Sequence, residues 1–199
     1  MTRLPPPTRD SVREDLRAIF DDVNARSSEG YGPMTVLRYS PELARRAVPL
    51  YQYVRNESTL PFKVRELAML TAARTADSPY MWNRHVAAGR KSGLSDALVD
   101  ALRDRKPLPP LDAAEDAVIR VVTEFFGQRR ISEETFDLVL AQFGAQGLVE
   151  LTALIGFYTM LAITANTVDL DLPANRSEPP LPVRSEEHTS ELQSRFGIS

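Results

Sequence analysis

The chain of 199 residues contains no cysteine. This absence excludes disulfide bonds, thiolate metal sites, cysteine nucleophiles and thiol redox chemistry. It is also compatible with a reducing cytoplasm, where we expect the protein to reside. A strong excess of one charge is missing too: the net charge is −3, which argues against nucleic acid as a partner.

Alternating strand patterns and membrane-length apolar runs are also lacking. The longest apolar segment, residues 148–168, contains Glu150 and several threonines, so we predict a buried helix and no membrane partner. No charged and then apolar amino terminus is present, so we expect no signal peptide. Hydrophobic residues make up 43% and charged residues 26%, as in a soluble domain. The fold class predicted from these features is all-α.

The last residues, 184–199, read RSEEHTSELQSRFGIS and resemble the translation of a sequencing adapter. We expect this segment to be disordered and exclude it from the fold, with a natural polar tail as the alternative. The natural carboxy terminus is then not represented. His188 is lost as a candidate, and His85 stands as the single native histidine. One histidine cannot make a two-histidine metal site, so we expect no metal.

The remaining chain divides into a proline-rich segment (1–9), a helical domain (10–170) and an irregular segment (171–183). Ser28 to Thr35 is predicted as a turn-rich connection, and Ser40 and Ser78 as N-caps before proline. Pro49 is expected to kink or interrupt its helix. Apolar periodicity and start and stop signals predict eight helices, at about 10–25, 40–55, 61–76, 78–92, 95–103, 112–126, 132–143 and 148–167.

The third and fourth of these helices carry the residues best suited to chemistry. Glu66 lies in an apolar helix, and His85 follows nineteen residues later. A buried carboxylate and an imidazole are a pairing that can transfer protons near neutral pH. Two structural alternatives stay open: an internal ion pair of Glu66 with a nearby arginine, and a packed, hydrogen-bonded core histidine.

The two helices also carry a family resemblance. The segments LPFKVRELAML (60–70) and YMWNRHVAAGRKSGLS (80–95) resemble the carboxymuconolactone decarboxylase family, within the alkyl hydroperoxidase D-like superfamily. The core of the likeness covers about residues 53–102, and GFYTMLAITAN (156–166) resembles the larger bacterial members. The resemblance implies the alkyl hydroperoxidase D-like helical fold. It also implies that Glu66 and His85 are the catalytic residues.

The function implied by the decarboxylase branch is a cofactor-free decarboxylase or isomerase of a small carboxylated or lactone substrate. Glu66 and His85 would form the proton shuttle, and Arg74 or Arg84 would hold a substrate carboxylate. The aromatic residues Trp82, Tyr80 and Tyr158 would wall the cavity, with a place in the core as the alternative for Trp82.

Two other functions are carried as alternatives. The peroxidase branch has cysteines where this chain has Ser78 and Met81, so a member of that branch would lack its thiol relay. A non-catalytic helical oligomer is the second alternative. The resemblance implies a homo-oligomer, commonly a trimer or hexamer, and we expect contacts through the helical hairpin region and the 148–167 helix, with Phe157 and Met160 as candidates. A cavity touching both Glu66 and His85 would favour an enzyme.

Overall fold

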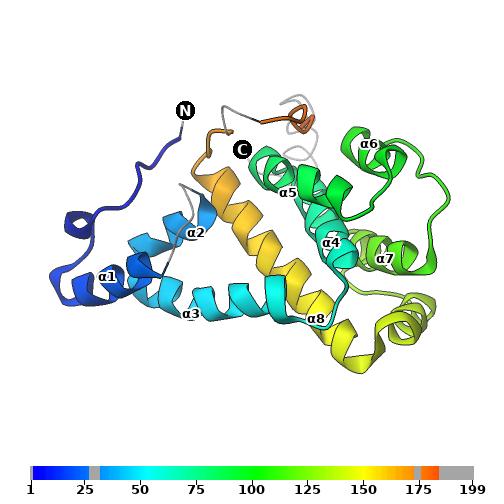
Figure 1. Ribbon diagram of the computed structural model, residues 1–199, viewed down its shortest axis with the longest axis horizontal. Coiled ribbons are helices and arrows are strands. Elements are labelled where there is room, and N and C mark those ends of the chain that lie inside the picture. Colours follow the sequence, from blue (N-terminus) through cyan, green and yellow to red (C-terminus); the bar gives the residue numbers. More distant parts are fainter. Residues whose placement is uncertain (1, 27–31, 173–175, 184–199) are drawn as a thin grey trace, which may run out of the picture.

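The structure is a computed structural model that describes residues 2–26, 32–172 and 176–183 (Figure 1). Its regular elements are all helical across these residues, which confirms the all-α class. The expected disorder of residues 184–199 lies outside the described residues. The elements are η1 (Arg9–Ser11), η2 (Glu14–Leu16), α1 (Arg17–Ala25), α2 (Pro33–Val36), η3 (Leu37–Tyr39), α3 (Pro41–Gln52), the π-helical η4 (Tyr53–Glu57), α4 (Phe62–Thr75), α5 (Pro79–Lys91), α6 (Asp96–Asp104), α7 (Ala113–Gln128) and α8 (Glu133–Thr167).

Helix α4 forms the centre of the core. It packs against α5, α7 and α8, and its side chains are buried on nearly every side. A helix that is apolar all round needs such neighbours, because no face of it gains from contact with water. Figure 1 shows α8 running obliquely across the molecule, with α1 to α3 on one side of it and α4 to α7 on the other. Glu66 is therefore placed in the interior by its own helix.

The first predicted helix begins later than the sequence indicated. Residues 10–16 form two short 3-10 turns, and the α-helix starts only at Arg17. The Ser11 hydroxyl donates to the Thr8 carbonyl at 2.7 Å and accepts from the Thr8 amide at 2.9 Å. Such side-chain bonds compete with the α-helical ladder and hold a tighter turn. The connection predicted at 28–35 also differs, because Pro33–Val36 is a short helix.

The helix starts show which serines act as caps. The side chains of Ser95, Asp112 and Ser132 accept from backbone amides three residues later. Ser40 and Ser78 occupy N-cap positions, but neither side chain makes a capping bond. Proline follows both, and its fixed φ already favours the first helical turn. The predicted positions are thus correct, while the predicted side-chain caps are wrong.

Helix α3 continues through Pro49 and widens into the π-helical segment η4. In η4 the Ser58 amide donates to the Tyr53 carbonyl at 2.9 Å. Tyr51 and Arg55 are four residues apart, so both lie on the same side of this element. Tyr53 takes another direction and donates its hydroxyl to Glu150 at 2.6 Å.

The seventh and eighth predicted helices appear as one long element, α8, with a break inside it. Gly144 has φ 67° and ψ 179°, a backbone conformation that is essentially limited to glycine. The sequence indicated Gly147 as the start of the second part, but Gly147 packs tightly against Phe143 instead. Phe157, expected at a subunit contact, is buried in the core beside Tyr51, at 6.1 Å between ring centroids.

By length and composition α8 could cross a membrane, but half of its most apolar window is buried inside the protein. This burial is typical of the core helix of a soluble protein. The absence of a membrane partner therefore stays a prediction.

The described parts of both chain ends lie on the helical body. The Arg3 amide donates to the Val168 carbonyl at 2.8 Å, and Thr2 donates from its amide and hydroxyl to Asp171. Further on, Leu181 is buried and the Pro182 carbonyl accepts from Arg74. The irregular carboxy-terminal segment is thus partly anchored to the domain.

Candidate functional site

Glu66 of α4 and His85 of α5 face each other inside the protein. His85 Nδ1 lies 3.1 Å from Glu66 Oε2, and the two residues are 3% and 2% exposed. The predicted contact across the two helices is confirmed. No arginine of the described chain forms an ion pair with Glu66, so the first structural alternative finds no support. With Glu66 ionised, Nδ1 carries the hydrogen that the carboxylate accepts, and Nε2 is left for another partner.

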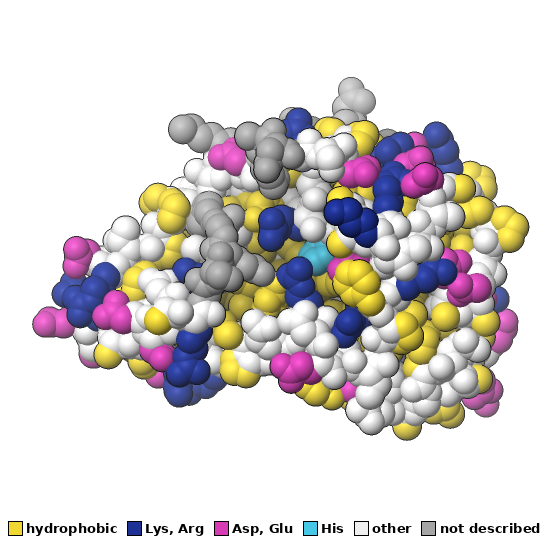
Figure 2. All heavy atoms as spheres, in the orientation of Figure 1, with side chains coloured by type: hydrophobic (Ala, Val, Ile, Leu, Met, Phe, Trp, Pro, Cys, Tyr) yellow, Lys and Arg dark blue, Asp and Glu magenta, His cyan; other side chains and the backbone are white. Residues whose placement is uncertain are grey.

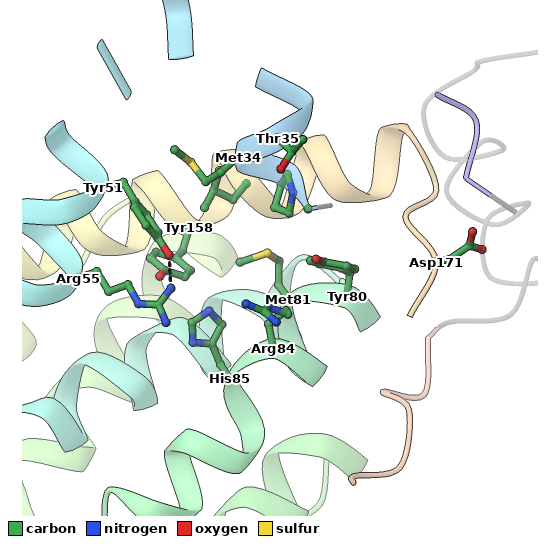
Figure 3. Close-up of a pocket in the computed structure, with 13 residues that line it drawn as sticks. Met34, Thr35, Tyr51, Arg55, Tyr80, Met81, Arg84, His85, Tyr158 and Asp171 are labelled. Carbon is green, nitrogen blue, oxygen red and sulfur yellow. Dashed lines mark hydrogen bonds between the residues drawn. The ribbon is translucent and has the colours of Figure 1, made fainter. Parts of the chain in front are cut away.

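A cavity of about 240 Å³ adjoins His85 (Figure 3). Figure 2 shows the histidine at the bottom of a hollow, beside basic side chains. Glu66 does not reach this space and lies behind the imidazole. The pair is therefore layered, with His85 toward the cavity and the carboxylate in the interior. The lining residues are 32–35, Tyr51, Arg55, Tyr80, Met81, Arg84, His85, Tyr158, Leu161 and Asp171.

Aromatic side chains hold the imidazole in place. The ring of Tyr158, on α8, meets the His85 ring edge-on, with 5.1 Å between centroids and 76° between planes. Such edge-to-face pairs prefer this geometry because a ring edge is positive and a ring face negative. Together with the bond to Glu66, this contact restricts the rotation of His85.

Two arginines give the cavity its positive charge. Arg84 lies on α5 next to His85, is exposed, and has no hydrogen-bond or ion-pair partner among the described residues. Arg55 comes from η4, where its guanidinium donates to the Tyr51 hydroxyl and lies 5.4 Å from the centroid of the Tyr51 ring. Figure 3 shows His85 between these two arginines. The acidic residue on the wall, Asp171, lies apart from them in the same view.

The structure brings together three of the five substrate-binding residues expected from the sequence. Tyr80, Arg84 and Tyr158 line the cavity with His85. Trp82 does not, because three residues before His85 it takes another side of α5 and is 0% exposed in the core. Its Nε1 has no partner among the described residues.

Arg74 also lies away from the cavity. It is at the end of α4, where it pairs with Asp77 and donates to the carbonyls of Arg103 and Pro182. This arginine ties α4 to α6 and to the carboxy-terminal segment. Its placement gives no support to a role in holding the substrate.

Sequence reasoning missed the wall that faces His85. Met34 and Thr35 of α2 and the Tyr51–Arg55 pair of α3 and η4 come from segments outside the motif. The spacing of an aromatic residue and an arginine by four is a weak signal that could have singled out Tyr51 and Arg55. Nothing local could have indicated the methionine or the threonine.

A second buried carboxylate, Glu150, contrasts with Glu66. It is 5% exposed and accepts from Tyr53, Gln146 and both the amide and hydroxyl of Thr59. Burial raises the pKa of its carboxyl, but the hydrogen bonds of Thr59, Tyr53 and Gln146 outweigh this and lower the pKa to about 2. Glu150 is fully engaged in joining α8 to the loop before α4, whereas Glu66 has the imidazole as its partner.

Metal or cofactor ligands were sought among the same side chains. Across residues 2–26, 32–172 and 176–183, no three His, Asp or Glu residues are grouped so that they could hold a metal ion.

Comparison with known proteins places the fold and the family. The sequence model of the carboxymuconolactone decarboxylase family matches residues 41–124, which include both Glu66 and His85. No curated protein sequence matches the chain significantly.

Solved structures share the fold at low sequence identity. A peroxidase-related protein from Silicibacter sp. TM1040 superposes with a TM-score of 0.67 at 18% identity, covering 88% of this chain and 93% of that one. For a protein of unknown function from Agrobacterium tumefaciens, connected with the antioxidant defence protein AhpD, the TM-score is 0.62 at 20% identity, with 73% and 100% covered. The debrominase Bmp8 in complex with 2,3,4-tribromopyrrole gives 0.63 at 15% identity, with 87% and 91% covered. Through the matched residues and this shared helical architecture, the chain belongs to the carboxymuconolactone decarboxylase family, with an AhpD-like fold.

Proposed function

We propose that this protein is a cofactor-independent enzyme that moves a proton to or from carbon in a small carboxylated or lactone substrate, as a decarboxylase or isomerase. The observation that carries the proposal is the layered pair: His85 faces a cavity while the buried Glu66 holds its other ring nitrogen at 3.1 Å. A carboxylate behind an imidazole fixes the tautomer and orientation of the ring and stabilises its protonated form.

The decarboxylation can be written with these side chains alone. Arg84 binds the substrate carboxylate or a neighbouring acidic group by charge-assisted hydrogen bonds. The bond between the carbon and its carboxylate breaks, carbon dioxide leaves, and the electron pair stays on the substrate in conjugation with an unsaturated group. Nε2–H of protonated His85 then delivers the proton to that carbon, and solvent reprotonates the imidazole. Isomerisation uses the same proton transfer without loss of carbon dioxide.

The cavity favours this function over a purely structural pair. A non-catalytic oligomer would need no space beside the imidazole, since interiors are normally close-packed. The cavity touches His85 but not Glu66, so the two residues have different roles. His85 is the proton-transfer group, and Glu66 acts through it.

The test is a screen of purified protein against lactone acids, with release of carbon dioxide and loss of substrate absorbance as readouts. We expect turnover that His85→Gln abolishes. Turnover that is equal in the wild type and in His85→Gln would overturn the proposal.

A second candidate is a peroxidase-superfamily protein that lacks the cysteine relay. The observation on its side is that Met81, at one of the relay positions, lines the cavity, while Ser78 at the other is fully buried. Without a thiol no sulfenic intermediate forms, so we expect no hydroperoxide consumption with a dithiol donor. Consumption at the rate of a thiol peroxidase would favour this candidate over the decarboxylase.

A further inference from the structure

The wall opposite the conserved-looking motif carries a cationic side chain that the proposed chemistry does not use. Arg55 lines the cavity from η4, about thirty residues before His85 in the chain. It is half-buried, and its guanidinium is held by the hydroxyl and the ring of Tyr51. A cation fixed in this way has little rotamer entropy left to lose when a ligand binds.

The size of the cavity limits what can bind beside Arg55. A cavity of about 150 Å³ holds a benzene molecule, so about 240 Å³ accommodates one ring with one or two small substituents. The rings of Tyr51, Tyr80 and Tyr158 form part of the wall. Flat side chains of this kind favour a planar, conjugated ligand, because rings stack or meet edge-on with them.

The charge around the cavity selects the sign of that ligand. Arg55 and Arg84 lie on the two sides of His85 (Figure 3), and the acidic lining residue, Asp171, accepts two hydrogen bonds from Thr2. Arg55 is the less exposed of the two arginines, so a charge pair formed with it is screened less by water. Its planar fork of donors suits a carboxylate better than an ammonium would.

The geometry points to Arg55 as the specificity-determining residue of the site, selecting a small planar ring compound that bears a carboxylate. This inference rests on the proposed function for the site and adds the substrate class. Arg55 is expected to discriminate an anionic ring from its uncharged analogue, while Glu66 and His85 supply the chemistry.

The experiment measures binding of two probes, benzoate and benzamide, to the full-length protein by calorimetry. Benzoate carries the charge and benzamide has the same shape without it. We expect Arg55→Met to weaken benzoate binding at least about tenfold, since a charge-assisted hydrogen bond is lost, and to leave benzamide binding unchanged. Arg55→Lys, which keeps the charge and loses the fork, is expected to recover only part of the affinity.

The matched control is Arg45→Met, which removes an exposed arginine of α3 that pairs with Glu42 outside the cavity. It is expected to bind both probes as the wild type does. Tyr51→Phe removes the hydroxyl that holds Arg55 and is expected to weaken benzoate binding by a smaller factor, which tests the site even if Arg55→Met folds poorly. Benzoate that fails to bind the wild type up to its solubility limit, or that binds Arg55→Met with unchanged preference over benzamide, would overturn the inference.

The outcome is separable from that of the proposed function. Loss of turnover in His85→Gln tests the proton transfer, whereas the benzoate preference of Arg55→Met tests the anion site without any turnover. Each result can fail while the other stands.

Discussion

His85 has two distinct surroundings, and this division determines what each neighbour can do. Its Nδ1 is committed to Glu66 in the interior, and the ring borders the cavity on another side. Glu66 cannot touch a ligand in the cavity, so it influences the reaction only through the imidazole. The assignment of a direct shuttle role to both residues, which the sequence suggested, is therefore refined to a proton-transfer residue and a positioning residue.

Replacement of Glu66 tests this division of roles. Glu66→Gln keeps the side-chain shape and one acceptor oxygen but removes the negative charge that stabilises protonated His85. We expect turnover to fall by about a hundredfold to ten-thousandfold while the fold is retained, because one general acid-base group is worth that much. The control is Glu57→Gln, an exposed carboxylate in η4. An unchanged pH–rate profile in Glu66→Gln would show that the pair is structural.

Glu150 gives a second residue-scale prediction, on stability and pH. Its pKa in the folded protein is lowered from 4.5 to about 2, so its ionised form stabilises the fold above pH 4.5. This contribution is lost as the pH falls from 4.5 toward 2, and it amounts to up to about 3 kcal/mol. We expect Glu150→Gln to lower the free energy of unfolding at neutral pH and to flatten its fall in acid. Parallel pH curves for wild type and variant, from urea unfolding, would contradict this.

The candidate site was predictable from the sequence only where its residues share one helix. Arg84 and Tyr80 lie near His85 on α5, and helical spacing brings them to the same cavity. Trp82 lies on the same helix yet points into the core, since spacing alone could not show which side of α5 is hollowed. Arg55 was out of reach, because its approach to His85 depends on how α3 and η4 pack across the core.

At the scale of elements, the local signals located most helices but not every boundary. Proline after Ser40 and Ser78, and glycine at position 93 with φ 98°, mark the ends of helices as the sequence indicated. The start of α1 was displaced by the bonds between Thr8 and Ser11, which periodicity does not register. The break in α8 was placed three residues late, because Gly144 and Gly147 have the same local appearance and differ only in backbone conformation and packing.

The two exposed glycines of α8 therefore respond in opposite ways to alanine. Gly144→Ala forces a side chain into a backbone conformation with φ 67° and ψ 179°, and we expect a loss of about 1–3 kcal/mol in unfolding free energy. Gly156→Ala adds a methyl group that meets nothing within 4 Å in regular helix, so a gain of about 0.5–1 kcal/mol is expected. Thermal and urea unfolding of both variants make the comparison. Equal effects of the two substitutions would mean that the break at Gly144 is absent in solution.

At the scale of the whole molecule, distant parts of the chain converge on one side of the cavity. Asp171 forms part of its wall and is held by Thr2, while α2 supplies residues 33–35 from near the amino-terminal end. The family core at 41–124 contains the chemistry, but these flanking segments complete the enclosure. Helical class and family followed from the sequence because periodicity and motif are local properties. The enclosure did not, since it depends on contacts between residues more than a hundred positions apart.

The exposed face of α8 supports the last prediction, that the protein is a homo-oligomer. Val149 and Ile163 are 62% and 59% exposed, and no charged residue lies on the exposed positions of α8 between them. An uncharged face of this length is costly to leave in water and is typical of surfaces that a second copy covers. We expect light scattering at micromolar concentration to show an assembly larger than a monomer. Ile163→Glu should dissociate it without unfolding the domain, because the side chain is not part of the core. The control, Leu43→Glu, changes a similarly apolar residue that is 45% exposed on α3 and should leave the assembly intact. A monomeric wild type, or an assembly that resists Ile163→Glu together with Val149→Glu, would contradict the assignment of this face.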